Sequence, residues 1–479
     1  MKKENHLLNE IMDSFALIHK EDKQRNWYMP GDPRYQPAPL QPFLGYDMWA
    51  NWLIVVEWFW FLTLAKIGVM PEKDAKLLTN NILFKLLRTI TTTRQDQEED
   101  KTRHDILALL NLMRQILPKR LHCWLHFGAT SYDIINTAYA LQLRLVFKYA
   151  FLPGLKEVDD LWRRHISNTA NILQAGRTHL QTALPVTIGF WLSYLHNRFV
   201  KSARLANNLS MQMPGKFTGA VGTSAAQRAL IRSKQGEKIL MRMLGIPAAE
   251  ISTQITPPEP MFRFYSELVS LSGAMANLGE DVRILQASQF GEIISASSSS
   301  SAMPHKTANP IAAENLAGMH ISVIAEFMKP LLTLVSDLQR DLRWSNVMRG
   351  YCATMTYVMQ QILTTKRVLN SIKINRKKCL DNFAVAGHLV VAELLHLALQ
   401  VQGYPGTHHL INKIIAPMAA KSGKNLPLVM EEYLVKNPDP ALKKSWEAVS
   451  NKVVFLLYHP EEYLGDAVKI SIRESTNKL

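Results

Sequence analysis

The chain has 479 residues, of which 47% are hydrophobic and 20% are charged. This balance excludes a disordered protein, and the length predicts roughly three structural units of about 150 residues each. The formal net charge of +15 is scattered, without a zinc-finger spacing, an RNP-type motif or a basic block interleaved with aromatic residues, so we expect an anionic small-molecule ligand and no nucleic-acid partner.

The N-terminal 30 residues are polar and lack the apolar core of a signal peptide, which predicts a cytoplasmic protein. Several prolines come next, from Pro30 to Pro42, and they exclude a regular helix there. We expect this N-terminal segment to be an extended arm.

The segment from Asp47 to Gln115 is expected to be helical, with breaks near Gly68 and in the charged run 94–103. Within it, residues 52–65 are nearly all apolar. They contain Glu57, however, and are fewer than the roughly 20 residues that a bilayer requires. We therefore expect a core helix and no membrane partner.

The middle third contains three apolar stripes with helical spacing. One steps by four and three residues through Phe264, Leu268, Leu271, Met275, Leu278, Val282 and Leu285. The others are Ile188, Trp191, Leu192, Leu195 and Phe199, and Met355, Val358, Met359, Ile362 and Leu369. The stripes predict long helices that pack side by side in a core or an oligomer interface. No phosphate-loop glycine pattern or metal-ligand spacing is found, so we expect neither a cofactor nor a metal.

After Ser371 the pattern changes, because a new helical stretch opens at Asn375 and turn residues divide the remainder of the chain into short pieces. The sequence thus predicts an N-terminal arm and helical domain (1–125), a central helix-bundle domain (126–370) and a C-terminal helical domain (371–479). The cysteines, Cys123, Cys352 and Cys379, show no pairing motif and are expected to be buried, reduced thiols.

A run of five serines, 297–301, precedes Met303, Pro304, His305 and Lys306. Serine side chains compete for backbone hydrogen bonds, so this segment is expected to be mobile. A serine-rich linker is the alternative, but a linker has no use for the residues after the serines. We interpret the segment as a catalytic loop.

Three further clusters place a histidine beside hydroxyl or basic groups: residues 102–105, 126–131 and 176–181. A single such histidine is more often structural than catalytic. Three clusters together with the serine loop favour proton-transfer chemistry with bound carboxylates.

At these residues the chain resembles the fumarase/aspartase superfamily, whose signature is Gly-Ser-Ser-x-Met-Pro-x-Lys-x-Asn, and within it the adenylosuccinate lyase family. The similarity runs in order through nearly the whole chain: Arg34 and Tyr35, residues 102–105, His126 with residues 130–133, residues 177–179 and 252–254, the serine loop, Glu314 and Asn315, residues 339–342, Ser345 and Arg349. The resemblance implies an all-α, three-domain fold with a central long-helix bundle, and a homotetramer whose subunits share active sites.

The resemblance also implies an anti β-elimination that cleaves a C–N bond of an N-succinyl nucleotide in purine biosynthesis, releasing fumarate with AMP or the imidazole ribotide. Ser300 would be the base and His179 the acid, while Lys306 and Asn309 would stabilise the dianion between proton removal and cleavage. The remaining implied substrate-binding residues are Thr130, Ser131 and Gln254 for the succinyl carboxylates, Arg34, Tyr35, His104, Arg340, Ser345 and Arg349 for the phosphate, and His126 and Glu314.

The chain departs from the superfamily pattern at four places. Ser299 replaces a glycine, one extra residue separates Lys306 from Asn309, and Ser224 stands where a histidine is common. Around residues 257–260 the basic or histidine-containing sequence of the family is missing. Two alternatives therefore stay open: a sister lyase acting on another succinyl compound such as argininosuccinate, and a noncatalytic scaffold. A scaffold would need none of the implied acid, base and lysine.

Overall fold

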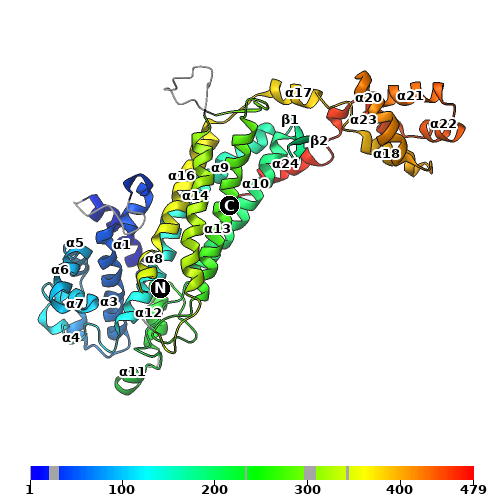
Figure 1. Ribbon diagram of the computed structural model, residues 1–479. Coiled ribbons are helices and arrows are strands. Elements are labelled where there is room, and N and C mark those ends of the chain that lie inside the picture. The colour runs from blue at the N-terminus through cyan, green and yellow to red at the C-terminus, as the bar shows by residue number, and fades with distance from the viewer. Residues whose placement is uncertain (1, 21–31, 232–234, 296–308, 341–344) are drawn as a thin grey trace. The chain divides into compact units, whose positions relative to one another are not determined.

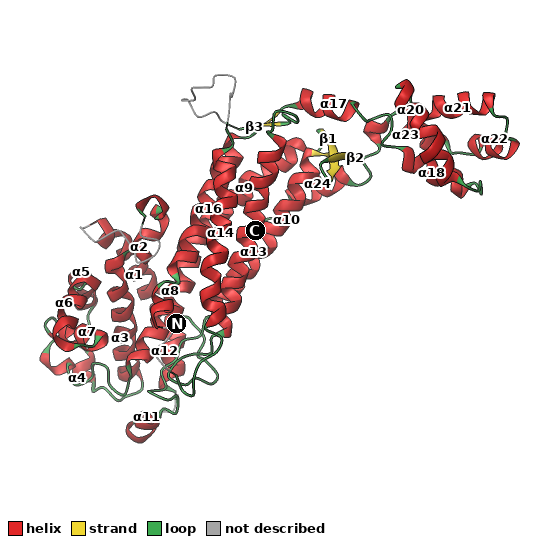
Figure 2. Ribbon diagram, viewed as in Figure 1, coloured by secondary structure: helices red, strands yellow, loops and turns green. Residues whose placement is uncertain are grey.

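The computed structural model describes residues 2–20, 32–231, 235–295, 309–340 and 345–479 (Figure 1). These residues are mostly helical, as expected, and their strands form two short antiparallel pairs (Figure 2). They fall into two compact units. Unit 1 comprises residues 1–157, 201–276 and 316–364, and unit 2 comprises residues 158–200, 277–315 and 365–479. The three-domain division groups the chain differently and stays a prediction.

The helices that lie wholly in unit 1 come from the N-terminal third and from short segments further on. They are α1 (Lys2–Lys20), α2 (Gln41–Leu44), α3 (Trp49–Lys66), α4 (Glu72–Ala75), α5 (Asn80–Thr89), α6 (Thr92–Thr102), α7 (Asp105–Arg114), α8 (Ser131–Val146), α11 (Ala225–Leu230), α12 (Gly236–Leu244) and α15 (Ser345–Arg349). Short 3₁₀ or π segments connect them: η1 (Pro33–Tyr35), η2 (Ala38–Leu40), η3 (Tyr46–Met48), η4 (Lys119–Leu121) and η5 (Phe147–Phe151).

The core of unit 1 is built around α3. Trp52, Trp58 and Trp60 are among its buried side chains, and 83% of the most apolar stretch of 18 residues within Tyr46–Lys66 is buried. The stretch Tyr46–Lys66 is long and apolar enough to span a membrane, but this burial is typical of the core helix of a soluble protein. The prediction of a core helix is confirmed.

Two expectations for the N-terminal third need correction. Residues 2–20 form helix α1, because Leu8, Ile11, Met12, Phe15 and Ile18 recur at helical spacing and are buried. Most of the charged run 94–103 is helical, because residues 94–102 lie in α6. The expected break comes only at the last residue of the run, Arg103, whose φ of 56° ends the helix in the left-handed region.

Five long helices contribute residues to both units: α9 (Leu152–Thr169), α10 (Ile188–Met211), α13 (Glu259–Leu285), α14 (Ile311–Leu332) and α16 (Cys352–Ser371). The heptad residues expected in α13, from Phe264 to Leu285, are all buried. Within unit 1, α13 contacts α14 through Ser272 and His320, and α16 contacts α14 through Gln361, whose Nε2 donates to Leu316 O at 2.9 Å. The expected packing of long helices is confirmed.

Unit 2 contains the strand pairs and a set of short helices. Strand β1 (Leu173–Thr178) pairs with β2 (Gln181–Thr187), and β3 (Ile293–Ile294) pairs with β4 (Lys373–Ile374). The helices are α17 (Arg376–Ala384), α18 (Ala392–Val401), α19 (Thr407–Leu410), α20 (Ala416–Ser422), α21 (Leu426–Lys436), α22 (Pro440–Glu447), α23 (Asn451–Tyr458) and α24 (Ala467–Ser475), with η6 (Ile411–Ile415) and η7 (Pro460–Glu462) between them. Helix α17 begins after Asn375, whose side chain accepts from Lys378 N, as the sequence predicted.

All three thiols are free. Cys352 and Cys379 are buried as expected, whereas Cys123 is exposed, which corrects the expectation for that residue.

Candidate functional site

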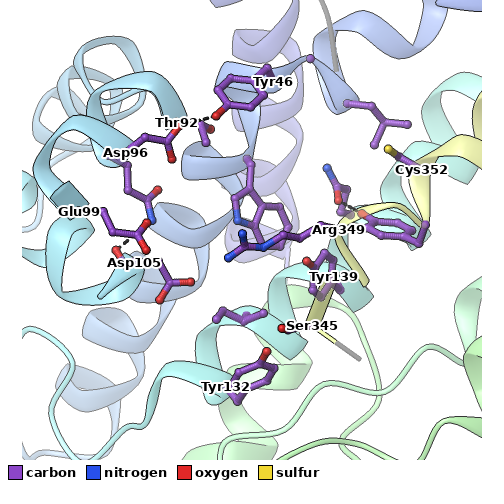
Figure 3. A pocket seen from close by; sticks show the side chains of 17 residues that line it. Tyr46, Thr92, Asp96, Glu99, Asp105, Tyr132, Tyr139, Ser345, Arg349 and Cys352 are labelled. Carbon is purple, nitrogen blue, oxygen red and sulfur yellow. Dashed lines mark hydrogen bonds between the residues drawn. The ribbon is translucent and has the colours of Figure 1, made fainter. Parts of the chain in front are cut away.

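Unit 1 encloses a cavity of about 130 Å³ at the junction of α3, α6, α7, α8 and α15 (Figure 3). One wall is aromatic, because the rings of Trp49 and Tyr139 stack at 4.5 Å and Tyr351 meets Tyr139 edge-on. Ser345 and Arg349 of α15, both expected in a phosphate site, line this cavity. The structure thus places two of the predicted binding residues in one pocket.

Three carboxylates also line the cavity: Asp105, from the cluster 102–105, and Asp96 and Glu99, which the sequence did not single out. They lie together on one side, and the Arg349 side chain extends toward them (Figure 3). Burial, and then the charge of Asp105, raise the pKa of Glu99, while Arg349 opposes them. Glu99 therefore takes up a proton more readily than an ordinary glutamate.

His104 and Ser131 meet beside this cavity, at the first turns of two helices. His104 caps α7, since its Nδ1 accepts from Leu107 N at 3.2 Å, and its Nε2 lies 3.3 Å from Ser131 Oγ. Because Nδ1 is an acceptor, neutral His104 carries its proton on Nε2 and donates it to the serine. Thr130 precedes Ser131 as the N-cap residue of α8, and its N–H donates to Asp133 Oδ2 at 2.9 Å. Two sequence clusters far apart in the chain are brought together here.

A second connection runs through Arg340. Its guanidinium lies 3.6 Å from the centroid of the Tyr132 ring, and Nη2 donates to the Tyr132 hydroxyl at 2.6 Å. Gln254 is close to the same loop, because its N–H donates to Gln339 O at 3.3 Å. The backbone at Arg340 has a φ of 149°, which is uncommon for a residue with a side chain. Arg340 and Gln254 thus join Ser131 around the start of α8.

A buried ion pair supports that helix start. Asp133 and Lys216 are fully buried, with 2.6 Å between Oδ1 and Nζ, and Asp133 also accepts from the N–H groups of Thr218 and Gly219. The loop that carries Lys216 turns at Gly222, whose φ is +84° and where a Cβ would lie 1.9 Å from Ser252 O. Only glycine fits there. This contact fixes the loop against the segment that leads to Gln254.

His126 is anchored by a carboxylate inside unit 1. Its Nδ1 lies 2.6 Å from Glu57 Oε1, and its N–H donates to the other oxygen of Glu57, which is buried in α3. Burial is the largest influence on the pKa of His126 and would lower it, but the charge and hydrogen bond of Glu57 together raise that pKa above its usual value. The sequence did not reveal Glu57 as the partner of His126.

His179 lies in unit 2, at the tip of the β1–β2 hairpin. Thr178 pairs with Gln181, so His179 and Leu180 are the two turn residues, with φ values of 55° and 60°. Two successive left-handed residues are the geometry of a type I′ turn, which usually takes asparagine or glycine. The turn leaves His179 exposed to solvent. Backbone strain of this kind concentrates at functional sites.

Unlike the exposed His179, Arg177 is occupied by contacts within unit 2. Its guanidinium pairs with the buried Glu292 and lies over the Phe290 ring at 4.5 Å. The register of β1 and β2 shifts between Ala175 and Arg177, and a Cβ at Gly176 would lie 2.5 Å from Leu184 O. The bulge at Gly176 therefore depends on glycine. It sets the orientation of the strand that carries Arg177.

The other predicted site residues are placed less closely or lie beyond the described ranges. Ser300 and Lys306 are outside the described residues, so their roles stay predictions. Glu314 is exposed in the first turn of α14, and Asn309 precedes that helix, half-buried. In unit 1, Arg34 is exposed and the ring of Tyr35 lies 6.1 Å from that of Tyr357. Among the residues that the structure describes, no three His, Cys, Asp or Glu side chains form a group that fits a metal ion.

Comparisons with known proteins agree on one family. The sequence profile of a lyase family matches residues 69–325, more than half of the chain. Adenylosuccinate lyase from Archaeoglobus fulgidus is 28% identical over 451 residues, which cover 91% of this chain and 96% of that protein. Adenylosuccinate lyase from Pyrococcus abyssi is 27% identical over 426 residues, covering 85% and 88%.

Solved structures show the same fold. Fumarate lyase from Mesorhizobium sp. BNC1 superposes with a TM-score of 0.70 at 22% identity, covering 90% of this chain and 96% of that one. The 3-carboxy-cis,cis-muconate lactonizing enzyme from Pseudomonas putida gives a TM-score of 0.75 at 20% identity, covering 92% and 97%. Because both identities are below 25%, these structures establish the fold of this chain and nothing about its activity.

Proposed function

Since this chain belongs to the lyase family, within the fumarase/aspartase superfamily, we propose that it is a carbon–nitrogen lyase that cleaves adenylosuccinate by β-elimination and releases fumarate and AMP in purine biosynthesis. The same chemistry on the succinylated imidazole ribotide belongs to the proposal. The observation that carries it is the meeting of His104, Ser131, Arg340, Ser345 and Arg349 around one cavity and the start of α8 in unit 1.

The chemistry of these groups suits a phosphorylated dicarboxylate. Guanidinium groups such as that of Arg349 pair with phosphate oxygens through two parallel hydrogen bonds. Hydroxyls and amides such as those of Thr130, Ser131 and Gln254 donate to carboxylates. Arg34 and Tyr35, at the N-terminal end of unit 1, are proposed as further phosphate contacts, and His126 and Glu314 as further substrate contacts.

In the proposed reaction, Ser300 removes a proton from the succinyl carbon beside a carboxylate. The resulting dianion is held by Lys306 and Asn309 until the C–N bond breaks, and His179 gives a proton to the departing nitrogen. The electron pair of the C–H bond becomes the new double bond of fumarate, and the pair of the C–N bond stays on nitrogen. The exposure of His179 supports this role, since a general acid has to reach its substrate.

We also propose a homotetramer with shared active sites. Its support is an apolar stripe on α14, where Ile321, Ile324, Met328 and Leu332 have near-heptad spacing and are 44% to 71% exposed. Such a stripe is stabilised when a second copy of the chain covers it. Sedimentation of the purified protein tests this. A stable monomer would contradict the assembly.

We further propose a cytoplasmic location. The free thiols support it, because thiols stay reduced in that compartment.

The activity is tested with a panel of succinyl compounds. Adenylosuccinate, its imidazole counterpart and argininosuccinate are each incubated with the purified chain, and fumarate is measured. We expect release from the first two. Release from argininosuccinate alone would favour a sister lyase, and no release from any compound would favour the noncatalytic scaffold.

His179→Ala and Ser300→Ala are each expected to lower turnover by about 10² to 10⁴-fold without loss of fold. Full activity in either folded variant would contradict the role given to that residue.

A further inference from the structure

Unit 2 contains a buried carboxylate, Glu292, whose side-chain partners come from two elements, β1 and α17. Glu292 is fully buried just before β3. Its Oε2 accepts from Gln174 Nε2 at 2.9 Å and from Arg177 Nη1 at 3.2 Å. Its Oε1 accepts from Arg177 Nη2 at 2.5 Å and from Asn382 Nδ2 at 2.8 Å. We call these four residues the Glu292 cluster.

The cluster joins three separate segments. Gln174 and Arg177 belong to β1, Asn382 belongs to α17, and the backbone of Glu292 accepts from Asn375 N at 2.8 Å. Asn382 Nδ2 also donates to Phe290 O, and the Phe290 ring lies under the Arg177 guanidinium. The Asn382 amide and the Arg177 guanidinium are therefore each held by two contacts, one to Glu292 and one to Phe290. A carboxylate has room for about four hydrogen bonds, and those of Glu292 are filled.

The surroundings are apolar enough to make this pairing strong. The neighbouring Cys379 of α17 is buried, and burial together with the charge of Glu292 raises the pKa of its thiol to about 12. Arg177 is 10% exposed in its side chain and Glu292 is not exposed at all. Removal of one charge from such a pair leaves the other buried without compensation.

The position of the cluster relative to His179 gives it a functional meaning. Arg177 and His179 are two residues apart on the same hairpin, and the bulge at Gly176 together with the left-handed turn at His179 leaves the tip strained. A strained turn persists only when its surroundings hold it. Among the described residues of unit 2, the bidentate pair with Glu292 is the only ion pair made by the hairpin between Gln174 and Gln181.

We propose that Glu292 is a positioning residue for His179. It fixes the hairpin through Arg177 and Gln174, so that the imidazole is presented at the place where the departing nitrogen needs its proton. The inference rests on the proposed function, in which His179 is the acid. Glu292 itself does not touch the substrate.

The test is a double-mutant cycle on fumarate release from adenylosuccinate. Glu292→Gln keeps the shape of the side chain and removes its charge. We expect kcat to fall by about 10 to 10²-fold with little change in KM, since a displacement of about 1 Å at a reacting group can cost this much. In the His179→Ala background the same change is expected to lower kcat less than about twofold, because residues that act as a unit are not additive.

Glu280→Gln is the matched control, since Glu280 pairs with Arg283 on the exposed face of α13 in unit 2. It is expected to leave kcat unchanged in both backgrounds. If Glu292→Gln is too unstable to assay, Arg177→Lys replaces it in the cycle. A lysine keeps the charge but cannot span both carboxylate oxygens, so the same loss of kcat that depends on His179 is expected.

The outcomes separate the two proposals. A wild-type chain that releases no fumarate contradicts the proposed function, and a His179→Ala variant as active as the wild type contradicts the role of the acid. With both of those in order, an equal fold-loss from Glu292→Gln in the two backgrounds would overturn the positioning role, because a merely structural defect lowers both alike. A loss confined to the background with His179 supports it.

Discussion

The Arg340 guanidinium lies on the face of the Tyr132 ring, 3.6 Å from its centroid, while Nη2 donates to the hydroxyl of the same tyrosine. Among the residues that the structure describes, the buried Nη1 has no hydrogen-bond partner. Tyr132 comes directly after Ser131 and lines the cavity of unit 1. Tyr132 thus holds the Arg340 guanidinium in place while its Nη1 still has no hydrogen-bond acceptor among the described residues.

The first prediction concerns this pair. Tyr132→Phe keeps the ring and loses one hydrogen bond, whereas Tyr132→Leu loses both contacts. If Arg340 binds the phosphate, we expect KM for adenylosuccinate to rise roughly threefold in the first variant and about thirtyfold in the second, with kcat within about twofold. Steady-state kinetics of both variants check this, with Tyr149→Phe outside the cavity as the control. An unchanged KM in Tyr132→Leu would contradict the phosphate role of Arg340.

The second prediction concerns the charge on His126. Glu57→Gln removes the carboxylate that raises the pKa of His126, and burial, which lowers the pKa, then dominates. We therefore expect the His126 titration to move to lower pH in the variant. NMR detection of the imidazole ring protons measures it. His165, whose pKa burial already lowers and which has a backbone carbonyl as its partner, is the internal control and is expected to stay in place.

The third prediction concerns the ion pair of Asp133 and Lys216. Lys216→Met leaves the aspartate buried without its counter-ion, and we expect the free energy of unfolding to fall by about 3–5 kcal/mol. Lys76→Met removes an exposed pair with Glu72 and is expected to change it by less than about 1 kcal/mol. Urea denaturation monitored by circular dichroism compares the two. Similar small losses in both variants would show that the buried pair does not hold the start of α8.

The fourth prediction is a pH dependence that originates in unit 2. His196 is fully buried between Asp159 and Glu474, at 2.8 Å from each. Burial would lower the pKa of His196, but the hydrogen bonds and charges of the two carboxylates raise it above 6.5. The stabilisation is therefore complete below the unfolded pKa of about 6.5 and is lost as pH rises through the higher folded pKa.

The two carboxylates behave in the opposite sense. Burial would raise the pKa values of Asp159 and Glu474, but their hydrogen bonds with His196 and other donors lower them, so their stabilisation is lost as pH falls through the folded pKa values. We expect His196→Gln to flatten the alkaline decline of the melting temperature, measured by calorimetry between pH values of about 6 and 9. His165→Gln has no raised pKa to remove and is the control. The same alkaline decline in His196→Gln and wild type would contradict this account.

The sequence by itself determined the helical class, the buried stripes and some of the residues around the cavity, among them Ser345 and Arg349. The stripe from Phe264 to Leu285 is readable because helix periodicity depends only on near neighbours in the chain. His104, Ser131 and Arg349 were found because their motifs resemble those of the superfamily. Helix α1 was missed because its polar composition hid a short stripe of apolar residues at helical spacing. The full extent of helix α6 was missed because the charged composition of residues 94–102 drew more weight than the N-cap at Thr91.

Only the tertiary structure decided which charges are buried together. Glu57, Lys216 and Glu292 are isolated charged residues in the sequence, yet they pair with His126, Asp133 and Arg177 over separations of 69, 83 and 115 residues. No local pattern encodes such a contact. A charge buried in an apolar interior is stable only with a partner, and that partner is brought to it by the packing of the whole unit.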